Sequence, residues 1–242
     1  MIDFIVAVYN SEATIERCVR SISRIDTPKT ISVIDNGSTD GTEKILEKIG
    51  SELKLNHYRT FIRSKAKAAN LAYRMTNSPI ICSVDSDVVY LEDKFKQLLS
   101  LLSDYDFLLL TDNTEDTHPS QVSLDYTFMP PRNSFLTTRR ILEDRIFSPI
   151  YPSCGGEDLD LMFRLLKRGA KAARIYGGYE HLRQTFQMGY KRRIHFHVWN
   201  IITYLKHIDT QYCRQRLAYL ASHPFTHFIN SIRQEAGRNI DT

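Results

Sequence analysis

The sequence predicts an α/β fold: a mostly parallel, mixed sheet flanked by helices, with a helical extension at the C-terminal end. Over the first 111 residues, apolar runs alternate with stretches of helical periodicity, and the connections between them are short. Such alternation is typical of a parallel sheet with helices on both faces. A length of 242 residues with 42% hydrophobic residues is enough for one sizeable core. From residue 181 onward there are nine Lys/Arg and three Asp/Glu, whereas the first 180 residues hold 23 Lys/Arg and 25 Asp/Glu. The C-terminal part is therefore the basic part of the chain.

The first element is an apolar run over 2–8, which predicts a buried strand. Polar residues over 9–12 interrupt it, and Ser11 is placed to cap the helix that apolar residues at helical spacing predict over 13–24. The later elements of this half follow the same two periodicities. They are a strand over 30–34, a polar loop over 35–42 that opens a helix, a weaker strand over 53–60, a helix over 64–75, a strand from residue 80, a helix over 91–103 and a strand over 107–111.

The pattern is less regular after residue 111, where polar and proline-rich stretches separate shorter elements. The clearest element in this region is a helix over 157–167, because Gly169 stands where a glycine commonly ends a helix. The expected elements are a loop over 112–120, a strand over 134–137, a short helix over 139–147, a loop over 148–156, the helix over 157–167 and a last core strand over 171–176.

The strand from residue 80 ends in two carboxylates separated by one serine, Asp85-Ser86-Asp87. In an open α/β sheet, ligands bind at the carboxyl ends of the strands. If the extended backbone continues through Ser86, both carboxylates share one face and can hold a hard divalent cation such as Mg2+ or Mn2+, which bridges phosphates. The alternative interpretation is a solvated turn that follows a buried strand.

Two further loops carry polar side chains to the same edge of the predicted sheet. In the loop over 35–42, Asp35 can accept a hydrogen bond from a nucleobase N–H or a ribose hydroxyl, although the loop composition equally suits a capped turn. In Gly155-Gly156-Glu157-Asp158 the acids stand at a helix N-terminus, which favours them electrostatically. One of them can also act as a general base toward an acceptor hydroxyl, and the two glycines allow a backbone or substrate to approach closely.

Cations and one histidine complete the candidate residues. Arg63, Lys65 and Lys67 lie at the start of the helix over 64–75, where they can neutralise phosphate or form a solvated face. His181 follows the last core strand. An imidazole close to a metal held by Asp87 would complete a mixed nitrogen and oxygen site, whereas a lone histidine is more often structural.

In this order and spacing, the motifs resemble those of the inverting nucleotide-sugar glycosyltransferases of family 2, which have the GT-A fold. The resemblance covers about residues 1–181. The matching segments are Val-Ala-Val-Tyr-Asn at 6–10, the loop at 33–42, the helix at 67–72, Asp-Ser-Asp at 85–87 and the Gly-Glu-Asp-Leu-Asp-Leu segment with its Arg-Leu and glycine at 156–169. Asn36 departs from the family pattern by replacing the second acid of the base-binding pair, and Arg63 and Lys65 stand where glycine is usual.

The resemblance implies a role for each candidate. Asp158 would be the catalytic base, and Glu157 would place the acceptor. The metal would be held by Asp87, with Asp85 and His181 beside it. The residues implied for donor binding are Val8, Tyr9, Asn10, Asp35, Lys67, Asn70, Asp85 and Ser86. The implied reaction transfers a hexosyl or N-acetylhexosaminyl group, with inversion, from a UDP-sugar to a hydroxyl of a glycan, lipid-linked sugar or other biopolymer, with Mn2+ or Mg2+.

The resemblance also divides the chain into a catalytic domain over 1–180 and a basic, aromatic-rich, mainly helical extension over 181–242. Within the domain, residues 1–111 would bind the donor, and residues 112–180 would bind the acceptor and supply the base. The extension mixes basic residues with aromatic and aliphatic ones. Packing of the extension on the catalytic domain is favoured over contact with an anionic membrane, and nucleic-acid binding is the weakest interpretation.

Two other function classes stay open. A nucleotidyltransferase on a similar fold would need a glycine-rich, basic loop for a triphosphate, whereas the loop here is Tyr9–Glu12. A catalytically silent domain would bind a sugar nucleotide or a partner, but would not need Asp87 and Asp158 together. Four distant cysteines and the absence of an N-terminal leader predict a cytoplasmic location, with peripheral contact at the inner face of a membrane as the alternative.

Overall fold

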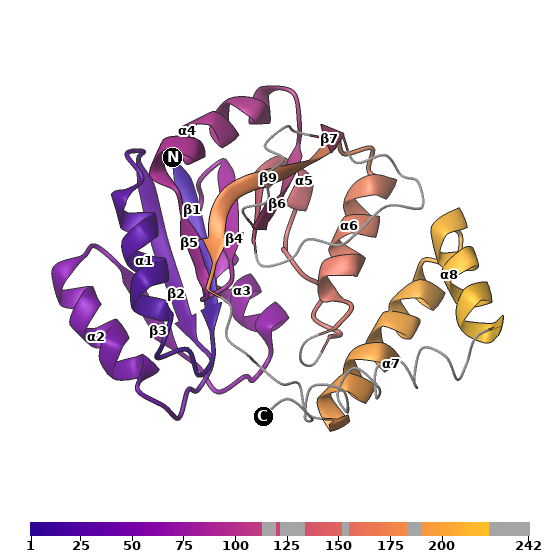
Figure 1. Ribbon diagram of the computed structural model, residues 1–242, viewed down its shortest axis with the longest axis horizontal. Coiled ribbons are helices and arrows are strands. Elements are labelled where there is room, and N and C mark those ends of the chain that lie inside the picture. The colour runs from indigo at the N-terminus through magenta and orange to yellow at the C-terminus, as the bar shows by residue number, and fades with distance from the viewer. Residues whose placement is uncertain (113–119, 122–133, 152–154, 183–189, 223–242) are drawn as a thin grey trace, which may run out of the picture.

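The computed structural model describes residues 1–112, 120–121, 134–151, 155–182 and 190–222 (Figure 1). The strands are β1 (Ile2–Val8), β2 (Lys29–Asp35), β3 (Asn56–Arg59), β4 (Ile80–Val84), β5 (Val88–Tyr90), β6 (Phe107–Asp112), β7 (Ser120–Gln121), β8 (Ser134–Thr138) and β9 (Ala172–His181). The helices are α1 (Ile15–Arg24), α2 (Thr42–Glu52), α3 (Lys65–Arg74), α4 (Glu92–Ser100), α5 (Arg139–Leu142), α6 (Glu157–Lys167), α7 (Tyr190–Lys206) and α8 (Gln211–Ser222), with a 3-10 turn at Leu101–Ser103.

The described strands form one sheet in the order β3-β2-β1-β4-β8-β6-β9-β5, and β7 pairs with β9 beside this path. Strands β1 to β4, β6 and β9 run in one direction, while β5, β7 and β8 run in the other. This is the mostly parallel, mixed sheet that the sequence predicts. Because β1 pairs in parallel with both β2 and β4, the carboxyl ends of these three strands meet at one edge.

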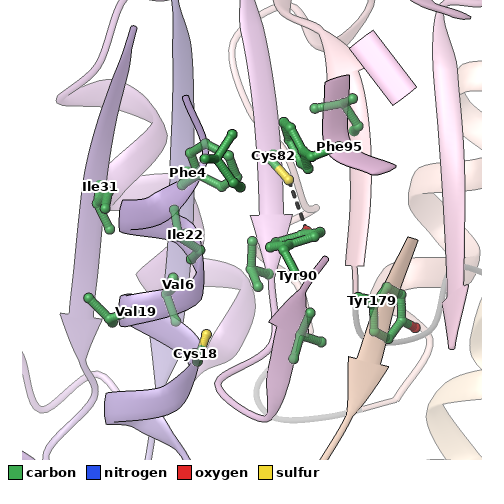
Figure 2. Close-up of a cluster of buried hydrophobic side chains, with 14 of the residues drawn as sticks. Phe4, Val6, Cys18, Val19, Ile22, Ile31, Cys82, Tyr90, Phe95 and Tyr179 are labelled. Atoms are coloured by element: carbon green, nitrogen blue, oxygen red, sulfur yellow. Dashed lines mark hydrogen bonds between the residues drawn. The ribbon is translucent and has the colours of Figure 1, made fainter. Parts of the chain in front are cut away.

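A cluster of buried side chains covers each face of the sheet. On one face, Phe4 and Val6 of β1 pack with Cys18 and its neighbours on α1 and with Phe95 of α4 (Figure 2). Residues of α2 belong to the same cluster. On the other face, Ile5 packs under α3 and α6, in a cluster that reaches Cys213 of α8. Alternate residues of β1 therefore point to opposite faces, as a central strand requires. Cys18 and Cys82 are both fully buried in this core.

Several elements differ from the sequence prediction, among them β7, which falls at the end of the loop expected over 112–120, and β9, which continues to His181 beyond the strand expected over 171–176. Helix α1 begins at Ile15, and the backbone carbonyl of Ser11, not its side chain, accepts from the first free N–H groups. The helix expected over 139–147 ends at Leu142, because Glu143 adopts a φ of 62°, which a right-handed helix does not allow. The strand that ends at Val84 turns and resumes as β5, which the sequence did not predict.

Helices α7 and α8 pack against each other beyond α6, on the side of the molecule away from α1 and α2 (Figure 1). Tyr212 and Cys213 of α8 are buried in the core cluster that α6 also supplies. The described part of the extension therefore packs on the sheet domain, which was the favoured interpretation. Among the described residues, no helix is both long and apolar enough to cross a membrane.

Candidate active site

Asp35 is the last residue of β2 and is fully buried at the carboxyl edge of the sheet. Its Oδ1 accepts hydrogen bonds from the backbone N–H of Ser38 at 2.9 Å and from the Ser38 hydroxyl at 2.6 Å. Its Oδ2 is buried and has no hydrogen-bond donor among the described residues, although Arg59 Nε lies 3.9 Å away. A buried carboxylate oxygen without a donor is costly, so this oxygen is a ready acceptor for a ligand N–H.

The residues after β1 form the adjoining wall. The carbonyl of Val8 accepts from the backbone N–H of Asn36 at 2.9 Å, which joins the two loops. Asn10 adopts a φ of 48°, and its side-chain oxygen accepts from the N–H of Thr39 at 2.8 Å. Tyr9 follows Val8, which pairs with Asp35 in the sheet, and its side chain is 49% exposed, so an aromatic ring is accessible at this edge.

The Asp85-Ser86-Asp87 segment is a turn, not a continued strand. The backbone N–H of Val88 donates to the carbonyl of Asp85 at 3.2 Å, and the hydroxyls of Ser86 and Ser11 lie 2.8 Å apart. The expectation that the two carboxylates share one strand face is therefore wrong. Asp85 contacts Lys65 of α3, whereas Asp87 contacts His181 of β9.

The turn places Asp87 next to His181 because β5 pairs with the end of β9, with Val88 opposite His181. The Asp87 Oδ2 lies 3.0 Å from the His181 Nε2, and the Leu182 N–H donates to the Asp87 carbonyl at 2.7 Å. Burial, together with the negative charge of Asp85, raises the pKa of Asp87 above its ordinary value. Carboxylate and imidazole are both ligands of Mn2+, so this pair fits a divalent ion. No third His, Cys, Asp or Glu among the described residues converges on it.

A small pocket between β4, β8, α3 and α6 brings Asp85 together with Asp158, the base expected from the sequence. Lys65, the first residue of α3, lies with its Nζ 2.9 Å from Asp85 Oδ1 and 4.0 Å from Asp158 Oδ2. Burial would lower the pKa of Lys65, but the carboxylates of Asp158 and Asp85 outweigh it, and the pKa is raised. The lysine is therefore a fixed cation in this pocket. The pocket is lined by Lys65, Ser83, Asp85, Ser134, Phe135, Phe147 and Asp158.

Asp158 lies in the first turn of α6, where the helix dipole and Lys65 both favour its ionised form. Burial nevertheless dominates, with added repulsion from Glu157 and Asp85, and raises the pKa of Asp158 to about 7. Glu157 is 3% exposed, and its Oε2 accepts from the N–H of Gly155 at 2.6 Å, so it holds the loop in front of α6. Burial also raises the pKa of Glu157.

The two glycines before Glu157 are explained by α7. Gly155 and Gly156 have φ values of 119° and 82°, a region that favours glycine. A Cβ on Gly155 would lie 3.0 Å from the Cα of Phe196, and one on Gly156 would lie 2.5 Å from the Thr203 hydroxyl. The backbone that approaches this loop is thus that of the C-terminal extension.

Two predicted donor residues lie away from this pocket. Lys67 is exposed on the outer face of α3, so it is Lys65 and not Lys67 that joins the carboxylates. Asn70 is buried, and its side-chain oxygen accepts from the N–H groups of Ile146 and Phe147 at 3.0 Å each. Its amide nitrogen donates to the Phe147 carbonyl at 2.7 Å. Asn70 therefore fixes the chain segment that carries the pocket residue Phe147.

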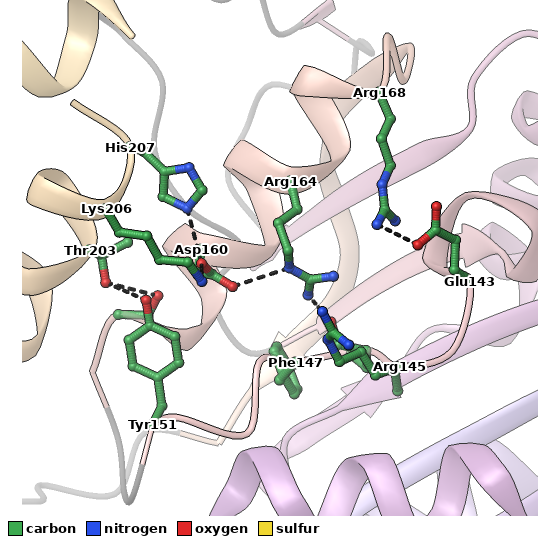
Figure 3. A network of polar contacts seen from close by, with 12 residues as sticks. Glu143, Arg145, Phe147, Tyr151, Asp160, Arg164, Arg168, Thr203, Lys206 and His207 are labelled. Atoms are coloured by element: carbon green, nitrogen blue, oxygen red, sulfur yellow. Dashed lines mark hydrogen bonds and ion pairs between the residues drawn. The ribbon is translucent and has the colours of Figure 1, made fainter. Parts of the chain in front are cut away.

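A buried polar network joins α6 to α7 (Figure 3). Asp160 is fully buried, and its carboxylate lies 3.1 Å from Arg164 Nε, 2.5 Å from Lys206 Nζ and 2.9 Å from His207 Nε2. Burial would raise the pKa of Asp160, but the hydrogen bonds from His207 and Lys206 outweigh it and lower the pKa to about 2. The Tyr151 hydroxyl lies 2.7 Å from that of Thr203 and adds a second link to α7.

Sequence reasoning did not give Lys65 or the Asp160 network a firm place in the site. The sequence did indicate that Lys65 lies near the site, because it is the first residue of a helix that follows β3 at the carboxyl edge of the sheet. Two partners of Asp160, Lys206 and His207, lie more than 40 residues away in the extension, and no local pattern indicates that contact.

Comparisons with known proteins place this chain in a family. A family model described as "Glycosyl transferase family 2" matches residues 3–149. The curated relative poly(ribitol-phosphate) beta-N-acetylglucosaminyltransferase TarS of Staphylococcus aureus (strain Mu50 / ATCC 700699) is 31% identical over 113 residues, which cover 44% of this chain and 20% of the relative. The chain therefore spans only a fifth of the length of that relative.

Solved structures agree in fold. S. aureus TarS 1-349 in complex with UDP-GlcNAc matches with a TM-score of 0.59 and 21% identity, over 84% of this chain and 66% of that chain. Mannosyltransferase PcManGT from Pyrobaculum calidifontis, in complex with GDP-Man and Mn2+, matches with a TM-score of 0.67 and 18% identity, over 99% of this chain and 80% of that chain. These likenesses show a GT-A fold, and the family model covers more than half of the sequence. The chain belongs to glycosyl transferase family 2.

Proposed function

We propose that this chain is an inverting glycosyltransferase that moves a sugar from a UDP-sugar to a hydroxyl group of an acceptor, with Asp158 as the base and Mn2+ or Mg2+ as the metal. The pocket in which Lys65 links Asp85 to Asp158 carries the proposal. It joins the loop that follows β4, where a sugar nucleotide would lie, to Asp158 in the first turn of α6. A silent binding domain would have no need for a base in this position.

The nucleotide would bind at the carboxyl ends of β1 and β2. The free Oδ2 of Asp35 would accept the ring N–H of uracil, and the exposed Tyr9 ring would lie beside the base. A guanine also offers ring and exocyclic N–H donors, and one structural relative holds GDP-Man whereas another holds UDP-GlcNAc. UDP is proposed on the family pattern, and GDP-sugars are the first competitors to test.

The reaction would be a single displacement. Asp158 accepts the proton of the acceptor hydroxyl, and the oxygen then attacks the anomeric carbon from the face opposite the diphosphate. The bond between the anomeric carbon and the diphosphate oxygen breaks, UDP leaves with the electron pair, and the configuration inverts. A divalent ion bound by Asp87 and His181 would act as a Lewis acid that offsets charge on the leaving diphosphate. Lys65 would hold Asp85 and Asp158 at a fixed separation.

The test is a donor screen with UDP-, GDP- and dTDP-sugars, each with and without Mn2+, in which binding and donor hydrolysis are both measured. Asp87→Ala should lose metal-dependent binding. Asp158→Asn should keep donor binding and lose turnover, because the amide cannot accept the proton. Binding without turnover in the wild-type chain toward every donor and acceptor would favour the silent domain. Normal turnover by Asp158→Asn would refute the assignment of the base.

A further inference from the structure

The outer face of α7 carries an exposed apolar stripe. Its members are spaced by four, three, four and three residues, which keeps them on one side of a helix. They are Ile194 (40% exposed), Val198 (46%), Ile201 (38%) and Leu205 (53%) in α7, followed by Ile208 (49%) just beyond it. Isolated exposed apolar residues are ordinary, but a continuous row of this length marks a surface that binds something.

The stripe is not the face by which α7 packs on the domain. Phe196 and Thr203 approach Gly155 and Gly156, and the Trp199 ring packs edge-on against Tyr151. These three residues are also spaced by three and four, and at 100° per residue they lie opposite the stripe. Helix α7 therefore has one apolar face in use and a second one exposed.

The charge around the stripe indicates what covers it. Between residues 190 and 222 the sequence holds six Lys/Arg and a single acid, Asp209, and one of the six, Lys206, is paired with the buried Asp160. Lys191, Arg192 and Arg193 form the first turn of α7, immediately before the stripe. At the other end, Arg214 donates to the carbonyls of Ile208 and Asp209 at 3.4 and 2.9 Å, so its guanidinium lies beside the last member of the stripe. In the sequence, basic residues therefore stand directly before the apolar row, and Arg214 lies beside its last member.

We propose that the outer face of α7 binds the surface of an anionic lipid bilayer, with the stripe in the acyl boundary and the basic residues among the headgroups. A helix that lies in a membrane interface has this combination of an apolar row and Lys/Arg with few acids. A second copy of the chain is disfavoured as the occupant, because paired α7 helices would bring two basic segments together without acids to offset them. Five side chains are also few against the roughly 20–30 residues per side of a stable interface.

The proposal has a consequence for geometry. The inner face of α7 contacts the glycine loop in front of Asp158, and the outer face would contact lipid. The base-bearing end of the site would then lie within one helix diameter, about 10 Å, of the bilayer surface. The inference concerns binding to lipid, so it stands independently of the proposed glycosyltransferase reaction.

The test is sedimentation of the full chain with vesicles of phosphatidylglycerol and phosphatidylcholine in equal parts, against vesicles of phosphatidylcholine alone. The wild-type chain should bind the anionic vesicles at least tenfold more strongly, and added salt should weaken this binding. Ile201→Glu with Leu205→Glu should lower the binding at least tenfold. Met75→Glu with Ile150→Glu, which puts the same two charges at sites that are 46% and 49% exposed outside α7, should bind as the wild type does.

Thermal unfolding midpoints of the variants should match the wild type, because both altered side chains of α7 are exposed. Equal binding of the wild type to neutral and anionic vesicles would overturn the proposal. So would unchanged binding of the Ile201→Glu/Leu205→Glu variant. A wild-type dimer that this variant converts to a monomer in light scattering would assign the stripe to a second copy and would equally overturn it.

Discussion

The Asp158 carboxyl experiences two opposing influences that together set its pKa. Burial and neighbouring carboxylates raise the pKa, while Lys65 at 4.0 Å lowers it, and the balance lies at about 7. A general base works only in its ionised form, so kcat/KM should fall about tenfold per pH unit below this pKa and level off above it. Donor turnover measured from pH 5 to 9 checks this. A flat acidic limb in the wild type would contradict the assignment.

Lys65 offers a second test at the same scale. Without its cation, Asp85, Glu157 and Asp158 would repel one another, and the pKa of Asp158 would rise further. Lys65→Met should therefore move the acidic limb of the kcat/KM profile upward by about one pH unit or more. Lys67→Met is the matched control, since it removes the same charge two residues along α3 on the exposed face. A shift in the control equal to that in Lys65→Met would show that the effect is not local.

At the scale of single elements, the glycine loop before α6 shows how the extension shapes the site. Gly156 and Gly169 both have positive φ, 82° and 73°. A Cβ on Gly156 would meet Thr203, Tyr151 and Trp199 within 2.9 Å, whereas one on Gly169 would meet nothing within 4 Å. The two positions share the backbone requirement and differ only in crowding.

Gly169→Ala should cost about 1 kcal/mol of unfolding free energy, the cost of a left-handed alanine. Gly156→Ala should lower the free energy of unfolding by a further amount of about 1–3 kcal/mol, because its Cβ would overpack the contact with α7, and it should displace α7 or Asp158. Urea unfolding of both variants measures the difference, and donor turnover reports the displacement. Equal costs at the two positions would show that α7 does not pack on the loop as described.

Some elements could be predicted from the sequence, and others could not. Strand β1 and helix α6 have the predicted bounds, because their hydrophobic patterns are strong and polar or glycine residues end them. Strand β5 was missed because three residues carry too little periodicity, and its stability comes from pairing with β9. That pairing brings Asp87 next to His181, so their proximity depends on a contact between residues 94 positions apart in the sequence.

At the scale of the whole molecule, the site depends on segments that are distant in the chain. Parallel pairing of β1 with β2 and β4 aligns the loops that carry Asp35 and Asp85, which the order of strands and helices could predict. The proposed base, Asp158, stands at the start of α6, and α7 packs against the loop in front of it. That second arrangement could not be predicted, because it rests on side chains that meet across the fold without any local pattern.

The Asp160 network predicts that the sheet domain and the extension unfold together. Asp160 has a pKa of about 2 when folded and 3.8 as a free side chain. Its stabilisation is therefore fully present above about pH 4 and is lost as the pH falls toward 2, an amount of about 2 kcal/mol. Asp160→Asn also leaves Arg164 and Lys206 without their buried partner, which should cost about 3 kcal/mol at pH 7. The free energy of unfolding in urea and the amide exchange of α7 are both measured. The difference between Asp160→Asn and the wild type should be largest at pH 7 and much smaller at pH 2.

The control for this prediction is Asp209→Asn, which removes an exposed carboxylate 2.8 Å from Lys167 on the same side of the molecule. An exposed ion pair is screened by water, so this variant should unfold close to the wild type at every pH. In Asp160→Asn, α7 should exchange its amides before the sheet unfolds, because the charged link between the two parts is gone. If α7 and the sheet still unfold in one transition of unchanged midpoint, hydrophobic packing through Tyr212 and Cys213 is sufficient to join them, and the network serves only to orient the helix that carries Asp158.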